Sequence, residues 1–297
     1  MLKPLSHSIR GIIVTILFII NIIFFPTLVI IFGLISRILP IASWRKIGRK
    51  LINECLVSSW IRGNNLIIAL TLPTKWDVSG TGTLKKNDSY FLICNHQSWV
   101  DILILQKIFG TKLPLLTFFM KQQLLWMLPF AGWACWALEF PFMKRPSKKY
   151  LKKHPHQKGY DVEATKNFCR RFKDQSITVI SFIESTRFTS EKKHKQHSPY
   201  THLLKPRAST PAFVLASMGD VLKHIINVTI VYPDNKKGLW DFVSGNIKKI
   251  IVRYEVLPID SSLCGDYENN REFRVKFQNW LNQLWQEKDS LISKIQA

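Results

Sequence analysis

The segment 95–101, Asn-His-Gln-Ser-Trp-Val-Asp, holds the residue types of a general base and of an acid that orients it. It follows the apolar run 90–94, a predicted buried strand, and opens a predicted helix over 98–108. An acid in the first turn of a helix can reach back to a side chain that precedes the helix. If Asp101 accepts a hydrogen bond from one imidazole nitrogen of His96, the other nitrogen is left as a base. The pair has no nucleophile of its own, and the alcohol of a substrate could supply one.

The same segment also has a purely structural interpretation. Ser98 and Asp101 have the spacing of a capping box, so Asp101 could serve only to complement the helix start. His96 would then be an ordinary loop histidine. The position of the segment favours an active site, because α/β proteins tend to place their sites in loops that leave a strand and open a helix. The positive potential of a helix start would also keep the imidazole neutral.

Two further clusters suit a phosphate. The first follows the apolar run 177–183, a second predicted strand, and comprises Glu184, Ser185, Thr186 and Arg187. Its arginine, hydroxyl and backbone N–H groups are good anion donors. The alternative is a strand-end turn with an incidental ion pair. The second is Arg145, which ends the apolar segment before it. The alternative interpretation of Arg145 is a basic side chain that snorkels at a membrane boundary.

The elements around these clusters predict an α/β fold. Further strands are expected at 225–231 and 247–257, and amphipathic helices at 161–173 and 271–292. Alternation of strands and helices favours a layered mixed sheet flanked by helices. The domain boundaries that we expect are a membrane anchor at 1–40, a connecting helical region at 41–74 and an α/β domain at 75–297.

The amino-terminal region predicts insertion into a membrane. Residues 11–36 contain no charged side chain. This uncharged run is long enough to cross a bilayer core. Pro26 lies in the middle, so we expect either one kinked span or a re-entrant helical hairpin. The flank after the run is the more basic one, which favours a cytoplasmic location for the domain that follows. The tryptophan-rich segment 115–142 is interpreted as buried or dipping into the interface.

The overall charge and the cysteines narrow the class of protein. Lys and Arg exceed Asp and Glu by 42 to 20, a formal charge of +22, which attracts nucleic acid or an anionic membrane. The most basic stretch, 140–160, has no nucleic-acid-binding signature beside it and is interpreted as a loop on anionic lipid. Five cysteines without a Cys-x-x-Cys pair predict neither disulfides nor zinc, which fits a reducing compartment.

Taken together, the clusters resemble the lysophosphatidate (glycerolipid) acyltransferase family. The segment 95–101 matches its Asn-His-x-Ser-x-x-Asp block, and 140–145 its second block, which ends in arginine. Residues 182–187 match the Phe-x-Glu-Gly-Thr-Arg block, and 228–233 resemble the fourth, a strand that ends in proline. All four occur in order between residues 90 and 233, and the whole chain resembles a bacterial branch of the family.

The resemblance implies a membrane-bound O-acyltransferase of the bacterial inner membrane. His96 would deprotonate the hydroxyl of a lysophospholipid such as lysophosphatidate, and Asp101 would orient His96. The hydroxyl would attack the thioester of acyl-CoA or acyl carrier protein directly, without an acyl-enzyme and without a cofactor or metal. The residues implied for the acceptor site are Arg145, Glu184, Ser185, Thr186 and Arg187. Lys205 and Arg207 could add to the positive field there. Membrane lipids are expected partners, and nucleic acid is not.

The sequence departs from the family pattern at three positions. Ser185 and Glu139 stand where the family usually or frequently has glycine, and Lys144 where it often has an acid. A positive φ at residue 185, if the block requires it, would cost energy for serine. These changes leave His96 and Asp101 intact and bear on the identity of the acceptor headgroup.

Other classes of protein fit the sequence less well. A serine hydrolase would need a Gly-x-Ser-x-Gly elbow, which is missing. The histidine pairs at 154/156 and 194/197 lie in lysine-rich stretches that disfavour a metal cation. A non-catalytic relative, or a basic protein that only binds membranes or nucleic acid, remains the alternative to an enzyme.

Overall fold

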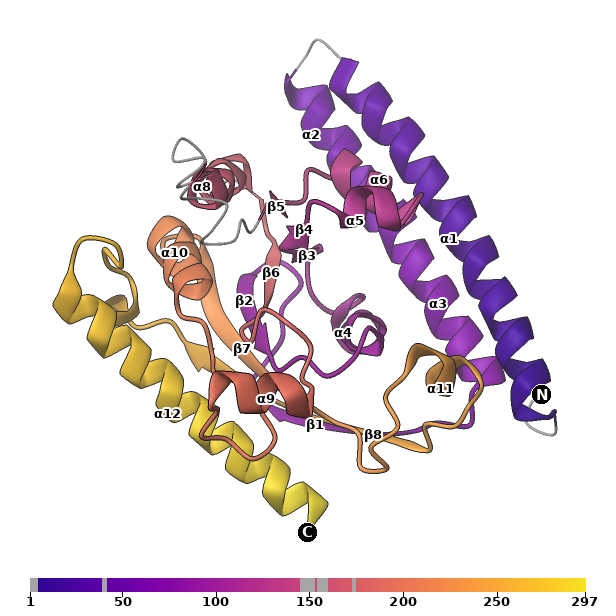
Figure 1. The fold of residues 1–297 in the computed structure, drawn as a ribbon. Helices are drawn as coiled ribbons and strands as arrows, with labels where there is room; N and C mark the ends of the chain where they lie inside the picture. The colour runs from indigo at the N-terminus through magenta and orange to yellow at the C-terminus, as the bar shows by residue number, and fades with distance from the viewer. Residues whose placement is uncertain (1–4, 39–41, 145–152, 154–159, 173–174) are drawn as a thin grey trace.

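The computed structural model describes residues 5–38, 42–144, 153, 160–172 and 175–297. Its centre is a six-stranded sheet with the order β1-β8-β7-β2-β6-β3. The strands are β1 (Lys75–Thr81), β2 (Ser89–Cys94), β3 (Leu116–Phe118), β6 (Thr178–Phe182), β7 (Leu222–Val231) and β8 (Lys249–Pro258). Helices lie on both sides of this sheet (Figure 1), which confirms the predicted fold class.

Strand β2 lies inside the sheet and is buried throughout, as its continuous apolar sequence predicts. It runs parallel to β6 and to β7, with Cys94 opposite Phe182 on one side and Val228 on the other. Strand β8 is antiparallel to β7. Because β2, β6 and β7 run parallel, their carboxyl ends meet at one edge of the sheet, where the segments after Cys94, Phe182 and Val231 come together.

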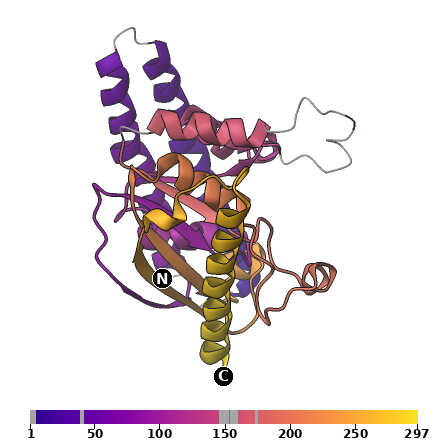
Figure 2. The same cartoon turned by 90° about the vertical axis from the view of Figure 1, so that its left-hand side faces the viewer.

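The two faces of the sheet are covered by different helices. Phe91 and Ile93 of β2 face one apolar core, and Leu92 and Cys94 face the other, because alternate residues of a strand point to opposite sides. The first face is covered by α8 (Tyr160–Phe172), α10 (Ser209–Met218) and α12 (Arg271–Gln296). Figure 2 looks onto this side, with α12 in front. The second face carries α4 (Val100–Phe109) and α11 (Leu239–Val243).

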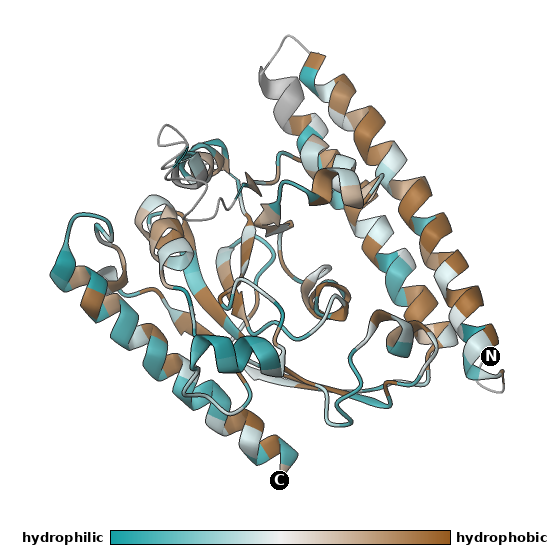
Figure 3. Ribbon diagram, viewed as in Figure 1, coloured by the Kyte–Doolittle hydropathy of each residue, from teal (hydrophilic) through white to brown (hydrophobic). Residues whose placement is uncertain are grey.

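The amino-terminal region forms an antiparallel helical pair. Helix α1 (His7–Ile38) lies along α2 (Ala42–Leu51), the π-helical η1 (Ile52–Val57) and α3 (Ser58–Thr71), as Figure 1 shows. Among the described residues, α1 alone is long and apolar enough to cross a membrane. Apolar residues predominate along α1, as the brown of its ribbon in Figure 3 shows, and many of them are exposed.

Helix α1 continues through Pro26, so the predicted break and the re-entrant hairpin within residues 11–36 are wrong. Proline removes only one N–H from a helix, and here the Thr27 hydroxyl donates to the nearby Ile23 carbonyl. Packing against neighbouring helices also supports α1. The buried Asn21 amide donates to the Asn64 side chain at 2.8 Å and to the Trp60 carbonyl at 3.1 Å, both on α3.

Residues 115–142 form several short elements instead of a long helix. They comprise β3, β4 (Met120–Lys121), α5 (Leu124–Met127) and α6 (Ala131–Ala137), and β4 pairs with β5 (Phe142–Met143). The segment is partly buried, since Ala134 is inaccessible, yet Trp126 is 73% exposed. Trp133 and Trp136 are also exposed. The segment therefore forms no second span, and the interpretation that it dips into the membrane interface stays a prediction.

The predicted elements agree with the structure to within a few residues at their ends. Strand β7 begins three residues before the expected start at 225, and α12 continues four residues beyond the expected end at 292. The elements that were not predicted include the edge strand β1, whose sequence lacks an apolar run, and helices α9 (Ser190–Gln196) and α10. The three-part domain division stays a prediction.

Candidate active site

His96 lies in the loop between the end of β2 and the start of α4. Its Nδ1 atom is 2.9 Å from the Oδ2 atom of Asp101, the second residue of α4. Because a carboxylate can only accept, Nδ1 carries a proton, and in the neutral imidazole Nε2 has the lone pair. The Asp101 side chain is fully buried, whereas that of His96 is 15% exposed. The pair therefore presents one basic nitrogen at the surface of the site, with its partner acid shielded from water.

Asp101 accepts hydrogen bonds from four donors. Besides His96, they are the backbone N–H of Gln97 at 2.7 Å, that of Ser98 at 2.9 Å and the Tyr232 hydroxyl at 2.6 Å. The two backbone bonds satisfy donors at the start of the helix, as a capping residue does. The structural and the chemical interpretations of this segment are therefore compatible, since one carboxylate holds the helix start and the imidazole together.

The plane of the His96 ring is set by Phe182 at the end of β6. The two rings stack at a centroid distance of 4.0 Å and an angle of 19°. The His96 carbonyl also accepts from the Phe188 backbone N–H at 2.8 Å. The histidine is therefore held by an adjacent strand as well as by its own loop, which favours a single orientation of the basic nitrogen.

Two residues that support the site were missed by the sequence analysis. Tyr232 follows β7, and burial, together with the charge of Asp101, raises its pKa well above the ordinary value. Its hydroxyl therefore remains a donor to Asp101. Asn95 joins the end of β2 to β7, because its amide donates to the Ile230 carbonyl and accepts from the Ile230 N–H, both at 2.9 Å. Both residues lie within the recognised blocks, which is the signal that could have found them.

Glu184 lies behind the site. Its side chain is 1% exposed, and neither carboxylate oxygen has a hydrogen bond of good geometry. Burial raises its pKa well above the ordinary value, although the nearby backbone N–H groups of His96 and Leu204 oppose this. Lys288 of α12 is also buried and donates to the Val228 carbonyl and, at 3.1 Å, to the Thr229 hydroxyl. An acid and a base from distant parts of the chain thus lie beneath the loops of the site.

The three residues that follow Glu184 make different contacts. Ser185 has a φ of 59°, so the left-handed backbone that glycine would adopt easily is present with serine. The Thr186 hydroxyl accepts from Lys192 at 2.9 Å. The Arg187 guanidinium lies 5.0 Å from the ring centroid of Trp99, next to the His96 loop. Of these three, Ser185 lines the cationic pocket described next.

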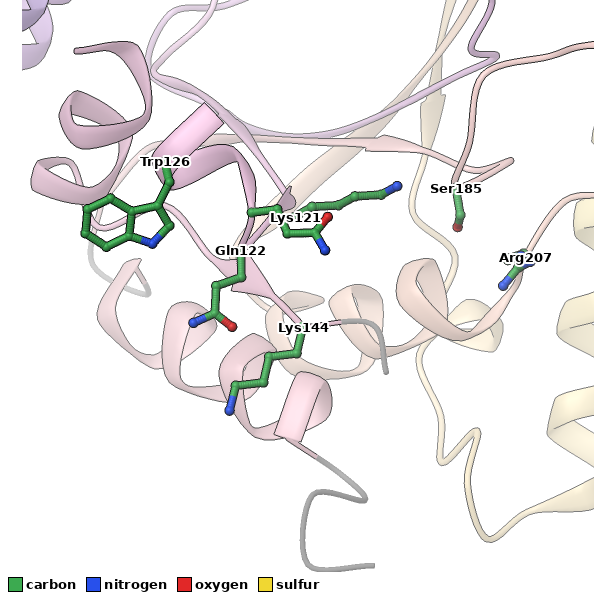
Figure 4. Close-up of a pocket in the computed structure, with 7 residues that line it drawn as sticks. Lys121, Gln122, Trp126, Lys144, Ser185 and Arg207 are labelled. Atoms are coloured by element: carbon green, nitrogen blue, oxygen red, sulfur yellow. The ribbon is translucent and has the colours of Figure 1, made fainter. Parts of the chain in front are cut away.

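A pocket of about 600 Å³ lies beside Ser185. It is lined by Lys121, Gln122, Gln123, Trp126, Lys144, Ser185 and Arg207. Figure 4 shows Lys121 between Trp126 on one side and Ser185 and Arg207 on the other. Three cations without an acid in the lining suit an anionic group. Arg145, the predicted site residue that follows Lys144, lies outside the described residues, and Lys205 does not line this pocket.

Lys237 is a further basic residue near His96. Its ammonium donates to the Gln97 side chain at 3.0 Å, and its carbonyl accepts from the Ser98 hydroxyl. Burial lowers its pKa, and the charges of Asp101 and Glu184 oppose that change. The loop after β7 is in this way tied to the loop after β2, which no sequence pattern indicated.

Comparison with known proteins agrees with this geometry. Residues 75–217 match the family described as Acyltransferase. The whole chain is similar to the crystal structure of the 1-acyl-sn-glycerophosphate (LPA) acyltransferase PlsC from Thermotoga maritima, with a TM-score of 0.57 and 15% identity over 97% of this chain and 98% of that chain. No curated protein matches the chain significantly in sequence.

These findings establish the class of protein. A histidine–carboxylate pair at the end of a buried strand, in a segment that matches an acyltransferase family, defines an O-acyltransferase. Residues 75–217 form a domain of the Acyltransferase family, and the fold of the whole chain is similar to that of a 1-acyl-sn-glycerophosphate acyltransferase.

Proposed function

We propose that this protein transfers a fatty acyl group from a thioester to the free hydroxyl of a lysophospholipid such as lysophosphatidate. The observation that carries the proposal is the His96–Asp101 pair, with one basic nitrogen exposed, in a molecule that also holds a cationic pocket. The acceptor alcohol supplies the nucleophile that the pair lacks. Acyl-CoA or acyl carrier protein is the donor that the family implies.

In the proposed reaction His96 acts as the general base. Its Nε2 removes the proton from the acceptor hydroxyl as that oxygen bonds to the thioester carbonyl carbon. The carbon–sulfur bond then breaks, and the imidazolium returns the proton to the leaving thiolate. Asp101 stabilises the imidazolium and holds Nδ1 in position, so no acyl-enzyme is needed. The stacked Phe182 ring limits rotation of the base.

The pocket beside Ser185 is the proposed site for the phosphate of the acceptor. Lys121, Lys144 and Arg207 line it and would neutralise a phosphomonoester, while Trp126 offers an apolar wall for the glycerol or the start of the acyl chain. Arg187, beside Trp99, and Thr186 lie nearer the His96 loop and would bind the reacting part of either substrate. Arg145 is proposed for the same phosphate on the family pattern alone.

The role that we propose for Glu184 differs from the expected contact with the acceptor. A carboxylate that is 1% exposed cannot line an open acceptor site, so the expectation of direct contact is corrected. Its proposed role is to support the backbone at His96 and Leu204, whose N–H groups lie near its carboxyl group. This places it among residues that support the site instead of those that touch substrate.

Helix α1 is proposed to lie within one leaflet of the membrane. Its amino-terminal end is tied to the α/β domain, because Arg10 donates to the Ser244 carbonyl at 3.2 Å. At its other end, Arg37 donates to the Trp136 carbonyl at 2.9 Å. A helix that contacts one globular domain at both ends fits an embedded position better than a perpendicular span. The exposed tryptophans of α5 and α6 suit the headgroup level.

The test is an assay of purified protein with labelled acyl-CoA and a panel of lysophospholipids. His96→Ala should lower transfer by about 10²–10⁴-fold, the usual contribution of a general base, without loss of folding. His194→Ala is the matched control, because this exposed histidine on α9 should leave the rate unchanged. A His96→Ala protein that works at the parent rate would overturn the mechanism, and no transfer to any acceptor would favour the non-catalytic alternative.

A further inference from the structure

A second pocket, of about 400 Å³, lies where the carboxyl-terminal end of α1 meets α6 and α8. It is lined by Arg37, Trp136, Glu139, Phe140 and Arg171. It shares no lining residue with the pocket beside Ser185, and the proposed acyl transfer uses none of its side chains. It is therefore a candidate for a separate ligand.

Arg37 is held in this pocket by neutral partners. Its guanidinium lies 4.3 Å from the ring centroid of Trp136 and donates to the carbonyls of Trp136 at 2.9 Å and Ala137 at 3.4 Å. Among the ion pairs of the described residues, none joins Arg37 to an acid. The side chain is thus fixed in direction while its positive charge is left without a counter-charge.

Arg171 supplies a second guanidinium, which pairs with Glu139 at 3.4 Å. Glu139 has a φ of 63°, a strained conformation for a residue other than glycine, and this conformation brings its carboxylate to Arg171. Two guanidinium groups face one carboxylate, so the pocket has a surplus of one positive charge. The planar fork of arginine suits the oxygens of a phosphate.

The place of the pocket on the molecule indicates which phosphate it would meet. Arg37 is the first charged residue after the uncharged run 11–36, and Trp133 and Trp136 are exposed beside it. Arginine and tryptophan at the end of an apolar helix are typical of the headgroup level of a bilayer. The exposed side chain of Leu34, one turn before Arg37 on the same face of α1, would lie along the acyl chains of a lipid bound at Arg37.

We propose that this pocket binds the phosphate of an anionic phospholipid of the surrounding membrane, at a site separate from the acceptor pocket. The inference rests on membrane contact by α1, but it does not depend on acyl transfer. Lipid bound here would hold the ends of α1, α6 and α8 together at the membrane surface.

The test is titration calorimetry of full-length protein in an uncharged detergent with dihexanoyl phosphatidylglycerol, and with inorganic phosphate as a second probe. The double variant Arg37→Gln/Arg171→Gln should bind the lipid about tenfold more weakly, as expected for lost charge-assisted hydrogen bonds. Glu139→Gln should bind it more tightly, because the competing carboxylate is removed. That gain is a result which misfolding cannot mimic.

The controls separate this site from the acceptor pocket. Lys121→Gln, in the pocket beside Ser185, and His96→Ala should both bind the lipid as the parent does, so failure of transfer and failure of this site are distinguishable. Parent-like binding by the double variant, or weaker binding by Glu139→Gln, would overturn the proposal. Equal affinity for inorganic phosphate and for the lipid would overturn the assignment to lipid.

Discussion

At the scale of single residues, the site depends on one buried acid. Asp101 gathers the His96 imidazole, two backbone N–H groups and the Tyr232 hydroxyl, so it links three segments of the chain. A residue that both caps a helix and orients a base has two measurable contributions. Substitutions that keep its shape can separate them.

Asp101→Asn should lower the rate of transfer strongly, by about 10²-fold or more, because the amide cannot stabilise the imidazolium and can select the wrong tautomer. If Asp101 were only a cap, the change would cost about 1 kcal/mol of stability and little activity. Steady-state kinetics and thermal melting of the same preparation measure the two contributions. A melting change without a rate change would contradict an orienting role.

Tyr232→Phe removes one donor to Asp101 and keeps the ring. We expect transfer to fall by about tenfold while KM for both substrates stays unchanged, because the carboxylate retains three of its donors. Tyr254→Phe on β8, whose ring packs against Phe109, is the control and should behave like the parent. A change confined to KM would instead indicate that Tyr232 contacts the substrate.

Arg207→Gln tests the acceptor pocket. The change should raise KM for a phosphate-bearing acceptor about tenfold, since a charge-assisted hydrogen bond is lost, with little effect on kcat. Transfer to an acceptor without phosphate, such as a monoacylglycerol, serves as the comparison and should not change. Equal losses for both acceptors would contradict recognition of phosphate at this pocket.

At the scale of elements, the turn after β6 and the turn before β5 carry strain. Ser185 has a φ of 59° and Glu139 one of 63°, at two of the positions where the sequence departs from a family glycine. Each of these residues lines a pocket. Ser185 lines the cationic pocket, and Glu139 lines the pocket at the carboxyl-terminal end of α1. The chain therefore retains a left-handed backbone at both positions with residues that carry a side chain.

Ser185→Gly should stabilise the protein. A left-handed conformation costs an L-residue about 1–2 kcal/mol, and the extra freedom of glycine in the unfolded chain offsets about half of this. The melting temperature should therefore rise by on the order of 2 °C. Ser58→Gly, at the first residue of α3 and with a φ of −63°, is the control and should lower the melting temperature. A fall for Ser185→Gly would show that the serine side chain makes a stabilising contact.

At the scale of the whole molecule, α12 closes the face of the sheet behind the site. Lys288 of this helix is fully buried, which lowers its pKa to about 8 from the ordinary value of 10.5. Charges from Cys94, Glu184 and Glu255 act in the opposite direction. Between these two pKa values the unfolded chain binds more protons than the folded one, so stability rises with pH in this range.

Stability should therefore depend on pH in a way that Lys288→Met removes. Relative to this variant, the parent should gain on the order of 2–3 kcal/mol of unfolding free energy between pH 7.5 and pH 10.5. The gain is lost progressively as the pH falls from 10.5 to about 8, because the lysine is then protonated in the unfolded chain before it is protonated in the folded one. Chemical unfolding at several pH values measures the difference. Parallel curves for the two proteins would contradict the burial of a titrating amine.

The attachment of α1 at both ends predicts how the molecule sits in a membrane. Carbonate extraction should leave the full-length protein in the membrane fraction. Cysteines introduced singly at Ser8 and Ile38, in a protein whose accessible Cys55, Cys135 and Cys264 are replaced by alanine, should both react with an impermeant reagent from the side that holds the catalytic domain, because both ends lie on one side. Reaction from opposite sides would show that α1 spans the bilayer.

The sequence by itself determined the buried strand β2, the helix that follows it and the meeting of His96 with Asp101. These two residues are five positions apart across one strand end and one helical turn, so local backbone geometry alone brings them together. The apolar character of α1 was equally plain, because it depends on composition. Family blocks supplied the class of reaction.

Only the tertiary structure decided which distant residues complete the site. Tyr232 is 131 positions from Asp101, and the Ile230 backbone group held by Asn95 is 135 positions away. Such contacts follow from the strand order that sets β7 beside β2, and periodicity does not encode strand order. The continuity of α1 through Pro26, the burial of Glu184 and the two pockets depend on packing between elements for the same reason.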